Sequence, residues 1–370
     1  MKSATIVGSI LTACVAATLL MVAESPSAPD STTWSSQAAA DYLDKRMEWW
    51  AGWPPAARDH GTFCISCHTS ASYAMGRPAL RSALHESGPS PVERRMLESI
   101  QTRVRLWRDV KPFYSDEERG APKTEESRGT ESVFDALILA RYDAPSGHLT
   151  PEARSAFDHM WALQLKTGDA RGAWSWLQFH NSPWEGDSQY YGATLAALAV
   201  GSAPGGYRDA LEIQDGLKML RDYLVREHES QVLINQMMLV WAGTKIPGLL
   251  TSQQQKAILD AALSKQQADG GFSLSSFVGD WKRHDGTPLE TRSDGYATGV
   301  VSLVLQEAGI KRDQPQLKRA LDWLRQNQEK SDGRWLAYSL NKQRDLSTDI
   351  GHLMSDAATA YAVLALTHAE

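Results

Sequence analysis

Cys64, Cys67 and His68 carry the most specific chemical pattern in the sequence, Cys-x-x-Cys-His. This spacing is the attachment signature of a c-type haem, in which two thiols add to the two vinyl groups of the porphyrin. The histidine beside the second thiol reaches the iron as the proximal ligand. We therefore predict one covalent haem c, attached at Cys64 and Cys67 and ligated by His68. A redox-active dithiol and part of a zinc site are the alternatives.

The surroundings of the motif favour haem over these alternatives. A thioredoxin-like dithiol belongs in a βαβ unit, and no convincing strand lies near the two cysteines. A zinc site needs a second close pair of Cys or His residues, whereas His148, His159 and His180 are scattered. Met354 is the candidate distal ligand of the iron, because it lies just before an apolar helical stretch, as the motif does. Packing in the core is the alternative role of this methionine.

Four acidic residues stand at or near the start of apolar helical stretches: Glu131, Glu185, Asp294 and Asp356. If these stretches all begin at one face of the protein, their carboxyl groups gather there and can bind substrate or move protons. We therefore take them as candidate catalytic residues. The alternative for Asp294 and Asp356 is that they cap helices, which stabilises each helix by about 1 kcal/mol.

The helical stretches recur along the chain. Three segments each contain a Gln near a helix end, then a Gly-x-aromatic turn, then an Ala/Gly-rich apolar helix. The residues of the three turns are Gln164, Gly172 and Trp174; Gln267, Gly270 and Phe272; and Gln328, Gly333 and Trp335. With three weaker copies, apolar helices start near residues 68, 130, 190, 231, 294 and 356. A period of about 60 residues indicates a repeat architecture.

The composition of these stretches predicts how they are arranged. A helix that is apolar all round must be buried on all sides. Six such helices meet this demand as an inner ring, with six amphipathic helices outside them. We therefore predict an all-α fold, an (α/α)6 toroid of six helical hairpins, with the haem motif (64–68) in the first hairpin. An open solenoid and two separate bundles are the alternatives.

The Gln…Gly-x-Trp turns resemble the repeats of squalene/hopene cyclases and the related prenyltransferase β-subunits. The resemblance covers residues 150–370 well and 35–150 weakly, and it implies an α/α barrel with a central cavity. The whole chain resembles exported bacterial proteins that join Cys-x-x-Cys-His to cyclase-like repeats, a group without an established activity. The sequence lacks the Asp-x-Asp-Asp motif of protonating cyclases, and after the targeting segment it has no cysteine beyond Cys64 and Cys67 for a prenyltransferase zinc site. The resemblance therefore implies a fold and not those activities.

The N-terminus is typical of a targeting segment. Lys2 precedes an apolar stretch over residues 6–23, and a Pro/Ser-rich segment follows. This order predicts a signal peptide or a membrane anchor over residues 1–28, followed by a single toroid domain over 29–370. Lipidation at Cys14 is a further alternative. We expect the protein in the periplasm or on the outer face of the cytoplasmic membrane, attached through residues 6–23 if they are retained.

Charge and motif together give the expected function. The 370 residues carry 38 basic and 44 acidic side chains, a net charge of −6, without a long basic run. Nucleic acid is therefore not an expected partner. We predict an exported c-type haem protein that transfers electrons to a redox partner through a haem at the mouth of the toroid. The alternatives are a haem-dependent enzyme that oxidises or isomerises an apolar, isoprenoid-type molecule in the cavity, and a non-redox binding module.

Overall fold

The computed structural model describes residues 1, 34–179 and 188–368. The chain divides into two units, Met1–Thr33 and Trp34–Glu370, and the fold below is that of the second unit. The predicted signal peptide or anchor lies outside the described residues. Within the described residues the regular secondary structure is helical, without a strand, and no helix combines the length and the apolar character needed to cross a membrane.

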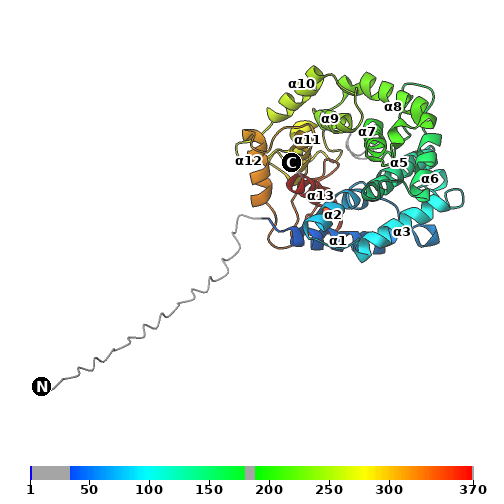
Figure 1. The fold of residues 1–370 in the computed structure, drawn as a ribbon. Coiled ribbons are helices and arrows are strands. Elements are labelled where there is room, and N and C mark those ends of the chain that lie inside the picture. The colour runs from blue at the N-terminus through cyan, green and yellow to red at the C-terminus, as the bar shows by residue number, and fades with distance from the viewer. Residues whose placement is uncertain (2–33, 180–187, 369–370) are drawn as a thin grey trace. The chain divides into compact units, whose positions relative to one another are not determined.

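The second unit is a double ring of helices (Figure 1). The inner ring consists of α2 (Ser70–Ala83), α5 (Lys123–Asp143), α7 (Gln189–Ser202), α9 (Leu233–Lys245), α11 (Gly295–Glu307) and α13 (Leu353–Thr367). The outer ring consists of α1 (Ser36–Gly52), α3 (Pro91–Arg105), α6 (Pro151–Ala162), α8 (Gln214–Glu227), α10 (Ser252–Leu263) and α12 (Pro315–Gln326). A single turn, α4 (Asp116–Arg119), lies between α3 and α5.

The inner ring is closed. Each inner helix packs against the next one along the chain, and α13 packs against α2 as well as against α11. Six hairpins therefore form one ring, and the prediction of an (α/α)6 toroid is confirmed. The contact between the first and the last inner helix excludes the open solenoid.

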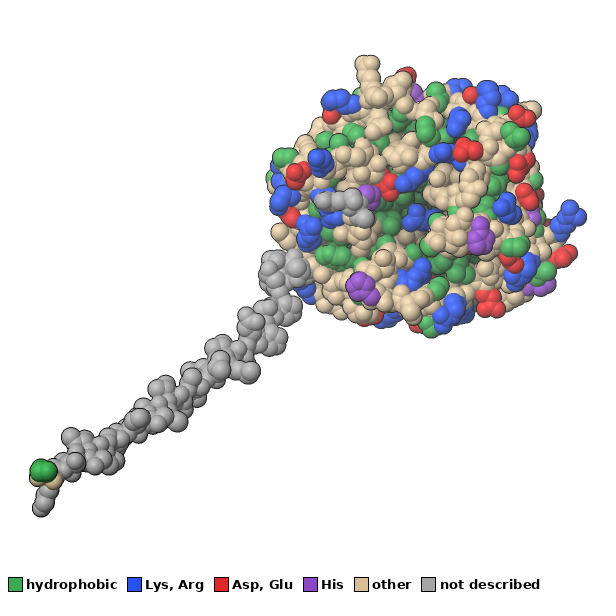
Figure 2. Space-filling model, viewed as in Figure 1, with side chains coloured by type: hydrophobic (Ala, Val, Ile, Leu, Met, Phe, Trp, Pro, Cys, Tyr) green, Lys and Arg blue, Asp and Glu red, His purple; other side chains and the backbone are tan. Residues whose placement is uncertain are grey.

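The two rings differ in sequence as their burial requires. Inner helix α7 buries every residue from Tyr190 to Val200. Outer helix α12 buries a stripe that contains Leu317, Ala320, Leu321 and Leu324, spaced at i, i+3, i+4 and i+7. In Figure 2, Lys/Arg and Asp/Glu side chains intermix around the periphery of one face, and hydrophobic side chains are visible toward its middle. Apolar periodicity therefore assigns each helix to its ring.

Side-chain caps start several outer helices where the sequence signals them. Ser90 and Glu93 form a capping box at the start of α3, and Thr150 caps α6. Thr251 and Gln254 form a second capping box at the start of α10. Each box satisfies two backbone N–H groups that a helix end would otherwise leave unpaired.

The Gln of the first repeat turn joins two neighbouring hairpins. Gln164 Nε2 donates to the carbonyl of Gly172 in its own turn (3.0 Å) and to the carbonyl of Gly216 in outer helix α8 (2.9 Å). Gly172 has a φ of 101°, a backbone conformation that residues other than glycine rarely adopt. A single amide thus fixes the turn and the start of the next hairpin together.

The second turn repeats this bridge with one shift in sequence. Gln266 Nε2 donates to the carbonyls of Gly270 (2.9 Å) and of Gln316 in α12 (2.7 Å). The residue that makes this bridge is Gln266 and not its neighbour Gln267, which the repeat pattern picked out. Gln267 instead donates its side-chain N–H to the carbonyl of Thr291 (2.6 Å). Because Gln266 and Gln267 are adjacent, the sequence alone does not show which of them makes the bridge.

The third turn closes the ring. Gln328 Nε2 donates to the carbonyls of Gly333 (2.8 Å) and Ser35 (3.0 Å), and Gln328 Oε1 accepts from the N–H of Ser35 (2.6 Å). Ser35 is the N-cap of α1, so these bonds tie the last hairpin to the first. A Cβ on Gly333 would lie 2.4 Å from the backbone of Ala38, so only glycine permits this approach.

The tryptophans that follow the turn glycines anchor the turns in the core. Trp174 Nε1 donates to the carbonyl of Met160 in α6 (2.6 Å), and Trp335 Nε1 donates to the carbonyl of Leu324 in α12 (2.7 Å). Both indoles are fully buried, and these bonds satisfy their only polar group. Each turn is therefore held at its glycine and at its tryptophan.

We predict that Gln328→Ala lowers the free energy of unfolding by about 2–3 kcal/mol, because three hydrogen bonds of about 1 kcal/mol each are lost. Gln326→Ala is the matched control, since Gln326 is exposed at the end of α12 and should change the free energy by no more than about 0.5 kcal/mol. Urea unfolding followed by circular dichroism measures both. Equal free energies for the two variants would contradict a role for Gln328 in closing the ring.

Candidate functional site

The Cys-x-x-Cys-His motif lies in the connection between α1 and α2. Trp50 of α1 donates its Nε1–H to the carbonyl of Cys64 (2.8 Å), and the N–H of Cys64 donates to the carbonyl of Ala56 (2.9 Å). The chain then enters α2, whose first residue is Ser70. The motif therefore leads into the first inner helix, and His68 lies two residues before that helix begins.

Ser66 organises the turn that contains the motif. Its Oγ accepts from the N–H groups of His68 and Thr69, both at 3.2 Å. Ser72 Oγ donates to the carbonyl of Cys67 (3.0 Å). Cys67 Sγ lies 3.3 Å from His68 Nδ1, so the second thiol and the imidazole are direct neighbours.

A buried ion network holds the chain just before the motif. Glu131 of α5 accepts a 2.5 Å hydrogen bond from Arg103 Nε of α3, and both side chains are inaccessible to solvent. The same guanidinium donates to Thr62 Oγ1 (3.0 Å) and lies 3.4 Å from Asp59 Oδ1. Burial raises the pKa of Glu131, and Arg103 opposes that rise. Because Thr62 is two residues from Cys64, this network fixes where the motif begins.

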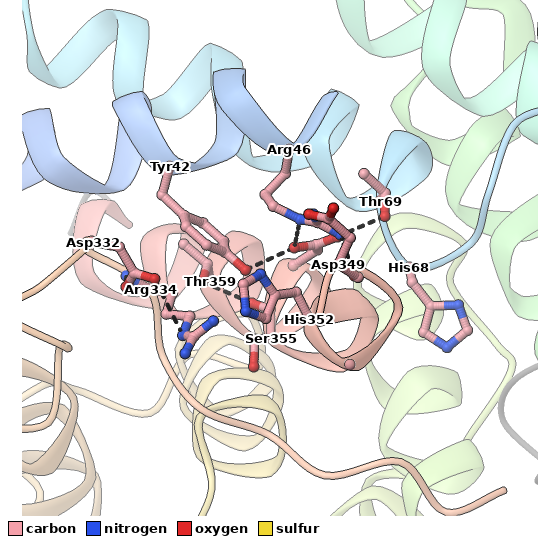
Figure 3. A network of polar contacts seen from close by, with 12 residues as sticks. Tyr42, Arg46, His68, Thr69, Asp332, Arg334, Asp349, His352, Ser355 and Thr359 are labelled. Carbon is pink, nitrogen blue, oxygen red and sulfur yellow. Dashed lines mark hydrogen bonds and ion pairs between the residues drawn. The ribbon is translucent and has the colours of Figure 1, made fainter. Parts of the chain in front are cut away.

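A second buried network holds the chain just after the motif (Figure 3). Asp356 of α13 accepts from Tyr42 Oη (2.8 Å), Arg46 Nε (2.8 Å) and Thr69 Oγ1 (2.7 Å). Burial raises the pKa of Asp356, and Arg46 opposes that rise. Thr69 directly follows His68, whose ring lies apart from the network in Figure 3. This network therefore fixes where the motif ends and leaves the imidazole outside it.

The three candidate acidic residues that the structure describes do not share a site. Asp294 caps α11: its carboxylate accepts from the N–H groups of Ala297 (2.9 Å) and Leu274 (2.6 Å), and burial raises its pKa to about 7. The capping alternative is therefore confirmed for Asp294 and wrong for Asp356, which lies within the first turn of α13. Glu131 lies in the middle of α5 and not near its start. Glu185 lies outside the described residues.

A cavity of about 170 Å³ opens beside the motif. Residues 64–68 form one wall, and the other walls are largely aromatic: Trp50, Phe113, Tyr114, Thr130, Phe134, Trp176, Leu177 and Phe179. Ligand pockets usually measure about 300–1,000 Å³, so this cavity holds one ring or the edge of a larger group. Met354 is buried in α13 and is not one of the lining residues.

Glycines bring the aromatic wall close to the inner helices. A Cβ on Gly192 of α7 would lie 2.3 Å from the ring of Trp176, and a Cβ on Gly129 of α5 would lie 2.1 Å from the carbonyl oxygen of Ser175. Larger residues at these two positions would push Trp176 out of the wall. This wall was not predicted from the sequence, although the 13 tryptophans of the chain were a signal for it.

The two thiols beside the cavity differ in exposure. Cys64 is 5% exposed, and burial raises its pKa to about 11, so it stays protonated at neutral pH. Cys67 is partly exposed, and neither cysteine forms a disulfide. Among the described residues, no cluster of three or more His, Cys, Asp or Glu side chains could hold a metal ion.

Similar proteins are found by comparing the fold. No family model and no curated protein matches the chain. A solved polysaccharide lyase matches it with a TM-score of 0.54 and 12% identity, covering 90% of this chain and 96% of its own. A structure titled UGL, a variant of an unsaturated glucuronyl hydrolase with the oligosaccharide dGlcA-Glc-Rha-Glc, matches with a TM-score of 0.54 and 11% identity, covering 90% and 95%. Identities this low show a shared fold, the α/α toroid.

These comparisons correct the function that the sequence predicted. We expected a cytochrome-type protein that transfers electrons, with a haem-dependent enzyme or a non-redox binding module as alternatives. Two solved proteins that share the fold along nearly their whole length, a polysaccharide lyase and a glucuronyl hydrolase, process carbohydrate. The prediction of an electron-transfer cytochrome is therefore wrong. The comparisons support the toroid that the cyclase resemblance implied, and not membership of the cyclase family itself.

We predict that Glu131→Gln lowers the free energy of unfolding by about 3–5 kcal/mol at pH 7, because buried Arg103 then keeps only the carboxylate of Asp59, 3.4 Å away. Asp135→Asn, one turn along the same helix, is the control. Asp135 Oδ2 has no hydrogen-bond partner, and burial raises the pKa of this carboxyl well above its usual range. The control should therefore change the free energy by less than about 1 kcal/mol. Urea unfolding of both variants is the measurement, and equal losses would contradict an ion pair at Glu131.

Proposed function

We propose that this protein processes carbohydrate and binds a sugar ring in the cavity beside residues 64–68. The observation that carries the proposal is the aromatic cavity, with a few polar groups, in a toroid shared with a polysaccharide lyase and a glucuronyl hydrolase. An aromatic wall contacts the apolar face of a sugar ring, while hydroxyl and imidazole groups fix its orientation. The volume of the cavity suits one ring of a longer saccharide.

Proton transfer is the chemistry that the lining residues can supply. His68 would act as the base and Tyr114 as the acid. Burial, and then the nearby Cys64, raises the pKa of Tyr114, which keeps its hydroxyl protonated. On a uronate ring the base would remove the proton on C5, the C4–O bond would break as a C4=C5 double bond forms, and the leaving oxygen would take the tyrosine proton. This elimination consumes neither water nor an oxidant.

Hydrolysis by two carboxyl groups has less support from the described residues. That mechanism places two carboxyls roughly 5–9.5 Å apart across the bond that is cleaved. Among the described residues, no carboxyl group lines the cavity. Glu131 and Asp356 are committed to buried arginines, and Asp294 is committed to a helix cap. An elimination therefore fits the lining residues better.

We predict that the purified protein cleaves a glucuronate-containing polysaccharide and that His68→Gln lowers kcat by about 100-fold or more, the usual contribution of a positioned base. Ultraviolet absorbance of the new double bond measures the rate, and circular dichroism checks that the variant folds. His148→Gln is the control, because His148 is exposed and does not line the cavity. New reducing ends that appear without this absorbance would indicate hydrolysis and would sink the role of His68.

We also propose haem c as a covalent cofactor at Cys64, Cys67 and His68. The donor set fits, because Cys67 Sγ and His68 Nδ1 are 3.3 Å apart and the neighbouring walls are aromatic. A cavity of about 170 Å³ would enclose only one edge of the porphyrin. The haem would supply an iron that His68 would hold. With His68 on the iron, the same imidazole could not serve as the base, so its two proposed roles exclude each other.

We predict that the chain, co-expressed with a c-type haem maturation system, shows the α-band of a c-type pyridine haemochrome and keeps the haem under denaturing conditions. Replacing Cys64 and Cys67 together by serine should abolish the band, because both thioether bonds are lost. Cys14→Ser should leave it unchanged, since Cys14 is not part of the motif. A folded wild-type protein that lacks the α-band after this co-expression would contradict the haem proposal, and the sugar proposal would remain.

The remaining proposals rest on the sequence. The Gln bridges and the buried tryptophans of the repeat turns support a relationship to squalene/hopene cyclases. We propose export to the periplasm or to the outer face of the cytoplasmic membrane, with residues 6–23 as signal or attachment. A redox partner and an apolar small molecule stay predictions.

A further inference from the structure

We propose that Arg58 and Arg119 form a carboxylate-binding subsite at the edge of the cavity, so that its ligand is an acidic ring. The inference rests on the proposed function, because it deepens the same site. The guanidinium carbons of Arg58 and Arg119 lie 5.1 and 5.2 Å from the ring centroid of Tyr114, which lines the cavity. The two cations are therefore no more than about 10 Å apart, beside one aromatic wall.

Neither arginine has an anionic partner among the described residues. Arg58 donates to the carbonyls of Pro55 and Ala57, and its buried Nε has no hydrogen-bond partner. Arg119 is exposed at the end of α4 and forms no ion pair, although Asp116, Glu117 and Glu118 precede it in that turn. Asp116 instead accepts from the N–H of Thr124 (3.0 Å). Two like charges thus lie close together in a chain whose net charge is −6.

A third cation at the same edge, Lys123, differs from the two arginines because it forms an ion pair. Lys123 Nζ lies 4.5 Å from the ring of Phe179, which packs 5.0 Å from Tyr114 and also lines the cavity. Unlike the two arginines, Lys123 is neutralised by Glu126 at 2.5 Å. The unpaired charge at this edge therefore belongs to Arg58 and Arg119.

The arrangement selects a ligand with a flat ring and a carboxylate. The ring would contact Tyr114 and its aromatic neighbours, and the carboxylate would accept charge-assisted hydrogen bonds from the guanidinium groups. A uronic acid residue of a polysaccharide has this chemistry, and a neutral sugar lacks it. The propionates of haem c offer the same carboxylate, so the source of the carboxylate has to be separated by experiment.

Calorimetric titration of the haem-free protein with a hyaluronan tetrasaccharide and with its carboxyl-reduced form tests the subsite. The wild type should bind the carboxylate form about 10-fold more tightly than the reduced form, because of the charge-assisted bonds. Arg119→Gln should abolish this preference and leave binding of the reduced form unchanged. Arg226→Gln is the matched control, since Arg226 also lies over a tyrosine ring, Tyr223 at 5.5 Å, but is paired with Glu227.

The outcomes separate the subsite from the proposed function. If the wild type binds both forms equally, or if Arg119→Gln keeps the preference, the subsite is overturned while sugar binding stands. If neither form binds, the sugar proposal fails. The haem-loaded protein then tests whether the subsite binds the haem propionates instead. There, Arg119→Gln should raise the pH at which the propionates titrate, read from the Soret band, whereas Arg226→Gln should not. An unchanged titration would then overturn the subsite.

Discussion

Closure of the inner ring is the constraint on which the rest of the structure depends. A helix that is apolar on every side loses stability unless neighbours cover both of its flanks, and in a row of six the two end helices would lack one neighbour. The contact between α13 and α2 removes both open flanks at once. The bonds of Gln328 with Ser35 and Gly333 hold this closure at the outer ring. The repeat turn therefore connects neighbouring hairpins and does more than reverse the chain locally.

The same closure explains why charges are buried around the motif. The connection from α1 to α2 keeps a Gly-x-aromatic sequence, Gly61-Thr62-Phe63, but no glutamine lies near the end of α1 to bridge it, so it needs other bonds to hold its course. Arg103 with Glu131 fixes Thr62 on one side of the motif, and Arg46 with Asp356 fixes Thr69 on the other. Replacing buried ion pairs by apolar residues is often neutral or stabilising. Their value here is that they set the position of residues 64–68 relative to three inner helices, which a purely apolar contact would do less specifically.

The periodic apolar pattern of the helices made the fold predictable from the sequence. The site was predictable only in part, because its residues lie far apart along the chain. Apolar helices expected near residues 190 and 294 begin at Gln189 and Gly295, because their pattern is local and repeated. Glu131 appeared to start a helix, but α5 begins eight residues earlier, at Lys123. The cavity joins Trp50, Tyr114 and Trp176, which lie in three separate connections and helices. No local pattern relates such residues, so only the closed ring reveals that they meet.

The burial of Cys64 bears on which ligand the site can take. Its sulfur is nearly inaccessible, its backbone is held by Trp50 and Ala56, and its thiol stays protonated at neutral pH. Thioether formation needs the sulfur to reach a vinyl carbon, so a haem would have to be attached before the α1–α2 connection closes. A sugar ring has no such requirement, because it would enter the finished cavity along Tyr114 and His68. If both proposals for the site hold, the order of folding and haem attachment would decide whether His68 serves as an iron ligand or as a base.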